Sequence, residues 1–297
     1  MIKLVNGDCI DEMKKIPSNS ISGCITDPPY NYEFIGRKWN VDEIKRRTER
    51  IKNSKTLIKN IPYGSGLSGG VRNELWYKKN RNNVKDYQNW IRDWGAELYR
   101  ILKPGAYVFT FNSTRSIANI QTSLEDIGFY ARDIIVWRRN SGIPKGLNLS
   151  LKMQKMGIND YDKWKNWNSC LRNEWEAISV VQKPLENNYI NTLKKYGVGL
   201  LYTLSDTNGF QSNIIENIKQ DLPDTFNTHI TIKPKDLIKK LIKMSIPLNR
   251  DNIVIDPFLG SGTTAVAAKE LGLQCIGIDI EKEYIEIARK RLQETSD

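Results

Sequence analysis

The stretch DPFLGSGTTA, residues 256–265, decides the fold. It lies between NIVI, which predicts a short buried strand, and GTTAVAAKELG, which predicts a helix. Gly260 and Gly262 have the G-x-G-x-x-A spacing, in which the absent side chains let the backbone approach a ligand and turn its N–H groups toward it. The strand QCIGIDI and the helix EKEYIEIARKRL follow. These residues therefore predict a βαβ unit with a cofactor at its loop.

Asp279 ends the second of these strands, about 20 residues past the loop, where a carboxylate can accept hydrogen bonds from both hydroxyls of a ribose. Loop and carboxylate together predict a cofactor that contains adenosine, without deciding which one. A nicotinamide-dependent dehydrogenase is the rival interpretation. It needs several more strand and helix units after the loop, yet only one strand and one helix remain before Asp297. The sheet must therefore be completed by strands from the N-terminal half.

The N-terminal half supplies such strands. MIKLVNGD predicts a strand that ends at Asp8, CIDEMKKI a helix, and ISGCI a buried strand that leads into TDPPYN, residues 26–31. Further along, YQNWIRDWGAELYRIL and SIANIQTSLEDIG predict helices, and AYVFTFN and FYARDIIVWRR predict strands. This alternation indicates an α/β fold. Taken alone, DPP is equally well explained as a stiff exit from a strand, since proline restricts the residue before it.

Composition limits the function classes. The 297 residues include four scattered cysteines and one histidine, which support neither a disulfide framework nor a metal site. No apolar run approaches the roughly 20 residues that cross a bilayer, and the N-terminus lacks a signal-peptide core, so we expect a cytoplasmic protein. The net charge is +11, and residues 37–85 hold 14 basic and 4 acidic residues. That segment is either a solvated face or a mobile insertion that contacts the phosphates of a polyanion.

With both motifs in view, the chain resembles the amino-group DNA methyltransferases that use S-adenosylmethionine, in the permuted order (β class) in which DPPY precedes FxGxG. The resemblance is carried by NGDCIDEMKKIPSNSISGCITDPPYN, LKPGAYVFTF, HITIKPKDLIKKLI and DPFLGSGTTAVAAKELGLQCIGIDIEKEYIEIARKRL. FIGRKWN and NEWEAISVVQKPL are similar to a subgroup common in phages and mobile elements. The resemblance implies a Rossmann-like, mostly parallel sheet with helices on both faces, circularly permuted, plus an irregular target-recognition module.

The resemblance also implies roles for individual residues. The catalytic set is Asp27, Pro28, Pro29 and Tyr30. The set expected to bind S-adenosylmethionine is Asp8, Cys9, His229, Thr231, Lys233, Asp256, Phe258, Gly260, Gly262, Thr263 and Asp279. Within it, Asp8 would lie at the adenine ring, Asp279 at the ribose and most of the others on the methionine side. His229, the only histidine, is as well explained as a structural residue.

The chemistry explains why these residue types are needed. The target nitrogen, N6 of adenine or N4 of cytosine, is a poor nucleophile because its lone pair is conjugated with the ring. The Asp27 carboxylate and the Pro28 carbonyl can each accept one N–H, which favours a tetrahedral nitrogen aimed at the sulfonium methyl. Tyr30 supplies a flat face on which an extruded base can stack. DPPY rather than SPPY favours adenine, so we expect an adenine-N6 enzyme.

Double-stranded DNA is the expected partner. The residues expected to contact it are Arg37, Lys38, Lys45, Arg46, Arg47, Arg138, Arg139 and Lys145. A homodimer and a cognate restriction enzyme are further candidate partners, and no membrane association is expected. The expected segments are residues 1–36 and 86–139 as the catalytic half, 37–85 as a basic insertion, 140–227 as the target-recognition region, and 228–297 as the cofactor half.

Several interpretations stay open from the sequence. Trp137 either forms a wall of the base pocket or packs in the core. Trp164, Trp167 and Trp175 either stack on displaced bases or form the core of a small module. For the function, the alternatives are an N4-cytosine enzyme, an RNA or protein-glutamine methyltransferase, and a DNA-binding relic without activity. The intact motif residues disfavour the relic.

Overall fold

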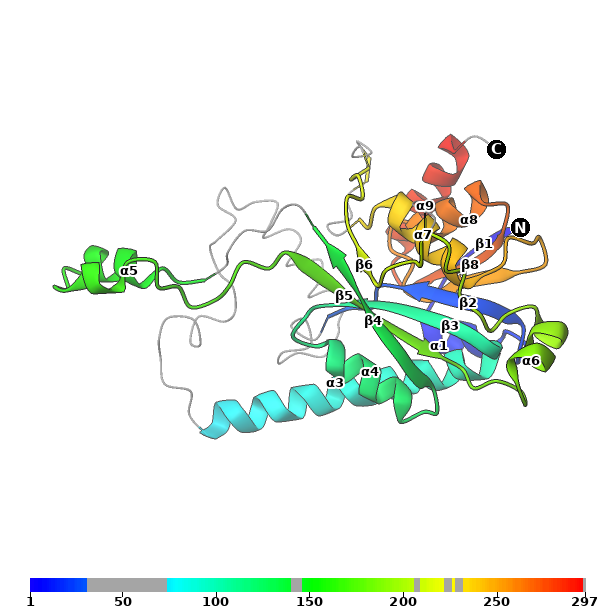
Figure 1. Ribbon diagram of the computed structural model, residues 1–297, viewed down its shortest axis with the longest axis horizontal. Helices are drawn as coiled ribbons and strands as arrows, with labels where there is room; N and C mark the ends of the chain where they lie inside the picture. Colours follow the sequence, from blue (N-terminus) through cyan, green and yellow to red (C-terminus); the bar gives the residue numbers. More distant parts are fainter. Residues whose placement is uncertain (31–73, 140–145, 206–208, 222–225, 228–231, 296–297) are drawn as a thin grey trace. The chain divides into compact units, whose positions relative to one another are not determined.

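The structure is a computed structural model (Figure 1). It describes residues 1–30, 74–139, 146–205, 209–221, 226–227 and 232–295. The chain divides into two compact units. The first comprises Met1–Tyr30, Asp86–Arg139 and Trp175–Asp297, and the second comprises Asn31–Lys85 and Asn140–Glu174.

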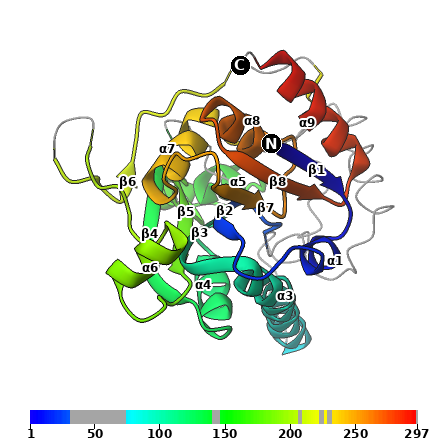
Figure 2. The ribbon, with the colours of Figure 1, turned by 90° about the vertical axis from the view of Figure 1, so that its right-hand side faces the viewer.

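The first unit is built on an eight-stranded sheet with the order β1-β8-β7-β2-β3-β5-β4-β6. The strands are β1 (Ile2–Asn6), β2 (Ile21–Thr26), β3 (Leu102–Asn112), β4 (Tyr130–Arg138), β5 (Trp175–Gln182), β6 (Ile214–Ile215), β7 (Ile253–Asp256) and β8 (Gln274–Asp279). β5 pairs antiparallel with β3 and β4, and the other neighbours pair in parallel. Strands from both ends of the chain share one sheet (Figure 2), which confirms the permuted α/β fold.

Helices cover both faces of the sheet, as predicted. The helices are α1 (Cys9–Lys14), α3 (Glu74–Ile101), α4 (Ile117–Glu125), α6 (Tyr189–Tyr196), α7 (Lys235–Ser245), α8 (Thr263–Glu270) and α9 (Lys282–Glu294). Figure 2 shows α1 and α4 on one face with the C-terminal half of α3, and α7, α8 and α9 on the other. Amphipathic helices such as α3, α4 and α7 pack here because each buries one apolar stripe, whereas α8 is buried at six consecutive positions. In α3 the buried stripe is Tyr87, Ile91, Trp94, Leu98 and Ile101.

One strand begins earlier than the sequence predicts. The pattern predicts a helix over YQNWIRDWGAELYRIL, which ends at Leu102, and a strand from Ala106, whereas β3 already starts at Leu102. Gly105 makes this possible because its φ of +83° lies in the left-handed region that glycine adopts at low cost. Its N–H donates to the carbonyl of Lys183 at 3.1 Å. The early start is accompanied by a register shift against β2 between Ile21 and Gly23.

The described part of the second unit contains α5 (Leu149–Lys155) and a 3₁₀ helix, η1 (Tyr161–Trp164). Trp164 and Trp167 meet edge to face with their ring centroids 6.1 Å apart. Both rings are exposed, at 41% and 64%, and α5 has no buried residue. Among the described residues Trp164 and Trp167 therefore form no buried core, which was one of the two interpretations, and Trp175 lies in β5 of the first unit.

The expected boundary of the recognition region also differs from the structure. Residues 140–227 were expected to form one irregular segment, but β5, α6 and β6 belong to the first unit, and β5 and β6 are strands of its sheet. β5 is buried along most of its length because it lies between β3 and β4. Among the helices described, none combines the length and the apolar character needed to cross a bilayer.

Candidate active site

The site begins where two neighbouring parallel strands end. Within the sheet, β2 pairs with β7 through Gly23 opposite Val254 and Cys24 opposite Ile255. Just beyond, Thr26 Oγ1 donates a hydrogen bond of 2.7 Å to Asp256 Oδ1. The DPPY segment and the glycine loop therefore start side by side, although 230 residues separate Thr26 from Asp256 in the chain. This is the edge at which open α/β sheets bind ligands.

The two carboxylate oxygens of Asp27 differ in their hydrogen bonding. Lys233 Nζ donates to Asp27 Oδ2 in an ion pair. Asp27 Oδ1 is buried and accepts no hydrogen bond from any residue that the structure describes. A buried acceptor without a partner costs about 1–3 kcal/mol, so a ligand that brings an N–H to this oxygen recovers that free energy.

Lys233 lies among two carboxylates and two aromatic rings. Its Nζ is 3.6 Å from Glu176 Oε2, 5.1 Å from the centroid of the Phe111 ring and 5.8 Å from that of Tyr30. Burial disfavours the ammonium form, but the charges of Asp27 and Glu176 outweigh burial and hold the pKa of Lys233 above its usual value. Lys233 is therefore a permanent cation at the DPPY segment.

Glu176 is a site residue that sequence reasoning missed. Its Oε2 accepts a hydrogen bond from the Tyr30 hydroxyl at 3.4 Å, and its Oε1 accepts one from Arg139 at 2.6 Å. It is the second residue of β5, and because β5 runs antiparallel, it begins at the edge where the parallel strands end. The only available signal was the stretch NEWEAISVVQKPL, whose place in the sheet cannot be read from its pattern.

The backbone of the DPPY segment is held by a hydrogen bond from α3. The Tyr87 hydroxyl on α3 donates to the Pro29 carbonyl at 3.1 Å, and Asn112 Nδ2 at the end of β3 donates to that hydroxyl at 2.9 Å. Tyr87 is fully buried. Because these partners belong to a helix and a strand, they hold the proline backbone rigidly. Neither Tyr87 nor Asn112 was singled out in the sequence.

Asp256, by contrast, has a hydrogen-bond partner for each of its two oxygens. Its Oδ1 accepts from Thr26 Oγ1 and from the Phe258 N–H at 3.1 Å, and its Oδ2 accepts from Thr264 Oγ1 at 2.7 Å. Burial raises the pKa of Asp256 to about 6, although the hydrogen bonds from Thr264 and Thr26 oppose the shift. The carboxyl group thus ties β2, the glycine loop and α8 together.

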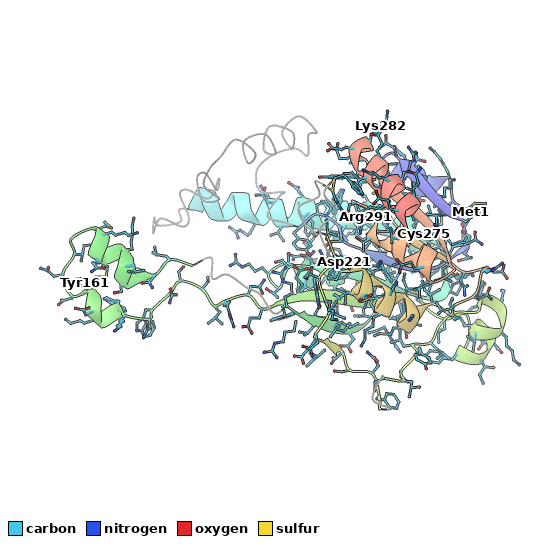
Figure 3. The ribbon with its side chains drawn as sticks, turned by 90° about the horizontal axis from the view of Figure 1, so that it is seen from above. Met1, Tyr161, Asp221, Cys275, Lys282 and Arg291 are labelled. Atoms are coloured by element: carbon cyan, nitrogen blue, oxygen red, sulfur yellow. The ribbon has the colours of Figure 1, made fainter. Side chains whose placement is uncertain are left out.

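The glycine loop is braced by α9. Gly262 caps α8 with a φ of +89°, and a Cβ there would lie 2.5 Å from the Ala288 Cβ, so only glycine fits. Arg291 of α9, labelled in Figure 3, donates to the Ser261 carbonyl at 2.9 Å and to Thr263 Oγ1 at 3.1 Å. The loop conformation is therefore fixed by packing and by a buried guanidinium.

Asp279 lies against the same loop. Its Oδ2 accepts from the Gly260 N–H at 2.7 Å, and its Oδ1 accepts from the Glu281 N–H at 2.9 Å. Burial raises the pKa of Asp279 to about 6. A carboxylate has about four acceptor positions, so both oxygens can still accept a hydrogen bond from a hydroxyl. The residues present therefore fit the ribose of an adenosine cofactor.

Two further residues of the expected cofactor set lie at this edge. Asp8 follows β1, whose Asn6 pairs with Asp279, and its Oδ1 caps α1 by accepting from the Ile10 N–H at 2.9 Å. Cys9 is buried, and burial raises the pKa of its thiol to about 12. The thiol therefore stays protonated at neutral pH.

Phe258 forms an aromatic cluster with α3. Its ring centroid lies 5.4 Å from those of Trp90 and Trp94. The loop thus contributes an apolar surface beside its backbone N–H groups. Trp137 is buried against Phe111, with ring centroids 6.3 Å apart, so it packs in the core.

The structure describes two residues of the expected DNA-contact set. Arg138 pairs with Glu216 at 2.8 Å, and Arg139 pairs with Glu176. The other members of the DNA-contact set lie outside the described part of the chain; they are Arg37, Lys38, Lys45, Arg46, Arg47 and Lys145. His229 and Thr231 of the expected cofactor set also lie outside it. Within the described ranges, no cluster of three or more histidine, cysteine or acidic residues could hold a metal ion.

Known proteins share both the sequence pattern and the fold. A family model described as DNA methylase, for N6/N4 methyltransferases, matches residues 21–290. The Type II methyltransferase M.HindIII of Haemophilus influenzae is 30% identical over 305 residues, which cover 97% of this chain and 94% of the relative. The Type II methyltransferase M.HinfI of Haemophilus influenzae is 27% identical, covering 98% and 68%.

Two solved structures show the same fold at low sequence identity. The complex of M1.HpyAVI with SAM has a TM-score of 0.57 and 21% identity, covering 98% of this chain and 99% of that one. The cytosine-N4-specific PvuII DNA methyltransferase has a TM-score of 0.62 and 14% identity, covering 98% and 86%.

Proposed function

The chain belongs to the DNA methylase family of N6/N4 methyltransferases, and on that premise we propose that it methylates the exocyclic N6 of adenine in duplex DNA. The family match and the Type II relatives make it a DNA methyltransferase that depends on S-adenosylmethionine. The choice of adenine over cytosine, and the roles of individual residues, are the parts that we propose.

The observation that carries the proposed transfer to an amino group is Asp27 Oδ1, which is buried and has no partner among the described residues. The choice of adenine over cytosine rests on DPPY in place of SPPY. An exocyclic amino group has two N–H bonds, and Asp27 Oδ1 can accept one of them. Lys233 occupies the other carboxylate oxygen, so the carboxylate has a fixed orientation. An amine whose N–H is held in this way can direct its lone pair away from the ring and toward a methyl donor. The Pro28 carbonyl is the candidate for the second N–H.

The remaining residues bind and orient the two reactants. S-adenosylmethionine supplies an electrophilic methyl group on a positively charged sulfur. Asp279 would hold its ribose and Asp8 its adenine ring, while the backbone of Gly260 and the ring of Phe258 would line its methionine side. Tyr30 would stack on the extruded base, which can reach the site only outside the duplex. Extrusion costs a few kcal/mol, which stacking and phosphate contacts would offset.

We also propose that the basic segment 37–85 and residues 140–174 contact the duplex. A homodimer and a cognate restriction enzyme, as expected for an enzyme of the restriction-modification type, remain predictions. The exposed Trp164 and Trp167 suit stacking on displaced bases, since their faces are not used by a core.

The test is product identification. The purified protein is incubated with methyl-labelled S-adenosylmethionine and duplex DNA, and the DNA is digested to nucleosides and analysed by mass spectrometry. We expect N6-methyladenine. N4-methylcytosine would replace the adenine assignment by its nearest alternative, because both amino groups can donate to Asp27. Label that appears only on RNA or protein supplied in parallel would contradict the DNA substrate.

A further inference from the structure

The cluster around Glu176 contains two carboxylates and two cations. Asp27 and Glu176 face Lys233, and Arg139 contacts Glu176 from the other side. The side chains of Glu176 and Lys233 are 13% and 9% exposed. Ion pairs at such burial add little to stability, because removing the charges from water costs about as much as the pairs return. The position of the cluster at the DPPY segment therefore suggests a role in the reaction.

Glu176 connects to the DPPY segment by two independent contacts. Through Lys233 it reaches Asp27 Oδ2, and through the Tyr30 hydroxyl it reaches the ring expected to stack on the base. Lys233 precedes α7, whereas Glu176 opens β5, so the cluster joins two elements that only the fold brings together. No other carboxylate of the described residues bonds both Lys233 and Tyr30.

The contacts also determine how the Asp27 carboxylate is oriented. A lysine ammonium on a flexible stem has several ways to contact a carboxylate. With Glu176 on one side of Nζ, the ammonium lies between the two acidic groups, and only Oδ2 of Asp27 is used. Oδ1 is left without a partner among the described residues. Removing the charge of Glu176 frees Lys233 to shift or to use both oxygens.

We propose that Glu176 is a positioning residue for methyl transfer, which holds Lys233 on one oxygen of Asp27 and the Tyr30 ring in place, so that the other oxygen receives the target amino group. This inference rests on the proposed role of Asp27. Glu176 touches neither the base nor the cofactor in this scheme. The proposal also gives Lys233, which the sequence predicts to bind the cofactor, a role beside Asp27, where the methyl-accepting amino group would bind.

The test uses the full chain with Glu176→Gln, which keeps the shape and the acceptor oxygen but removes the charge. Single-turnover methylation of duplex DNA, equilibrium binding of S-adenosylmethionine and thermal unfolding are measured in parallel. We expect the rate to fall about 10- to 100-fold, the loss typical of a small misplacement of reacting groups, while the cofactor affinity stays close to that of the unchanged protein. A lower Tm is expected because the charges of Arg139 and Lys233 lose a partner, so the Tm serves to show that the variant is folded at the assay temperature.

The matched control is Glu97→Gln. Glu97 is also a half-buried carboxylate in an ion pair, with Arg100 at 2.9 Å. Arg100 contacts the carbonyls of Met13 and Ile16, before the start of β2, so this pair lies at the opposite edge of the sheet from Asp27. The control should methylate at the unchanged rate. Glu176→Asp keeps the charge with a shorter reach, and it should lose less rate than Glu176→Gln.

The outcomes separate the two proposals. If Asp27→Asn is inactive but Glu176→Gln turns over at the unchanged rate, the positioning role is wrong and the acceptor role stands. If Glu176→Gln loses rate, cofactor affinity and Tm together, the residue is structural and the inference also fails. If Asp27→Asn retains turnover, the proposed acceptor itself is wrong. Should Glu176→Gln not fold, Glu176→Asp carries the same comparison of rate with cofactor affinity.

Discussion

Asp27 and Asp256 each precede a proline at the end of a strand, and the two strands are neighbours in the sheet. Asp256 is 4% exposed, and both of its oxygens accept hydrogen bonds from the protein. Asp27 has one oxygen paired with Lys233 and one without a partner among the described residues. The dipeptide Asp-Pro therefore has two uses: Asp256 stabilises the fold, and Asp27 offers a hydrogen-bond acceptor.

The difference teaches that surroundings, and not the motif, assign the role. Asp256 is surrounded by hydroxyls and an N–H that come from its own loop, from α8 and from the neighbouring strand. Asp27 pairs with Lys233, and Lys233 in turn contacts Glu176; both partners come from distant parts of the chain. A satisfied buried carboxylate stabilises the fold, whereas an unsatisfied oxygen costs free energy that a ligand can recover.

The largest effect is expected for Asp27→Asn. Asparagine keeps the shape but places an NH₂ group where an acceptor is needed, and it leaves Lys233 paired with Glu176 alone. We expect the single-turnover rate to fall by about 10³-fold, the scale measured when one transition-state hydrogen bond is lost from an active site. Binding of S-adenosylmethionine, measured by calorimetry, should persist. A rate within tenfold of the unchanged protein would remove the contrast between the two aspartates.

Asp256→Asn should instead affect stability. The amide group cannot accept at both positions, so at least one of the donors from Thr26, Thr264 and Phe258 loses its partner. We expect the free energy of unfolding to fall by about 1–3 kcal/mol, measured by denaturant titration. The rate per folded molecule should fall far less than in Asp27→Asn. A reversed ranking of the two variants would show that Asp256 belongs to the chemistry.

The stability deficit of Asp256→Asn should also depend on pH. The pKa of Asp256 is raised from 3.8 in the unfolded chain to about 6 in the folded protein, chiefly by burial. The folded state therefore binds the proton more tightly, and this contribution to stability is complete below the lower pKa and is lost as the pH rises through about 6. The deficit relative to the unchanged protein should be larger at pH 5 than at pH 7. Asp279 titrates in both proteins, so its contribution cancels.

The comparison also shows what the sequence could and could not predict. The glycine loop, Asp279 and the DPPY segment are recognised by local spacing, and the apolar runs before them predict the strands at whose ends they lie. Fold and cofactor edge were therefore predictable. Glu176 was not, because its role depends on β5 running antiparallel between β3 and β4, and no local pattern encodes that position.

Lys233 also shows that local sequence does not determine the contacts of a site residue. Its motif context was recognised, and contact with the cofactor stays a prediction, but its contact with Asp27 was not expected. The structure places its ammonium on Asp27, because the segment before α7 brings it to the end of β2. Local sequence predicts that a residue lies at the site, but which partner it contacts depends on packing between elements far apart in the chain.

The smallest effect is expected for Thr264→Val, which removes one of the hydrogen bonds that hold Asp256. Valine has nearly the shape of threonine, so the change deletes the hydroxyl and leaves Asp256 Oδ2 without that donor. We expect a loss of about 1 kcal/mol in the free energy of unfolding, typical of a single hydrogen bond, with methylation by the folded protein nearly unchanged. Thr264→Ser, which keeps the hydroxyl and removes only the methyl group, is the control. If the rate per folded molecule falls in Thr264→Val but not in Thr264→Ser, the position of Asp256 affects the reacting groups. The connection would be Thr26, which donates to Asp256 and directly precedes Asp27.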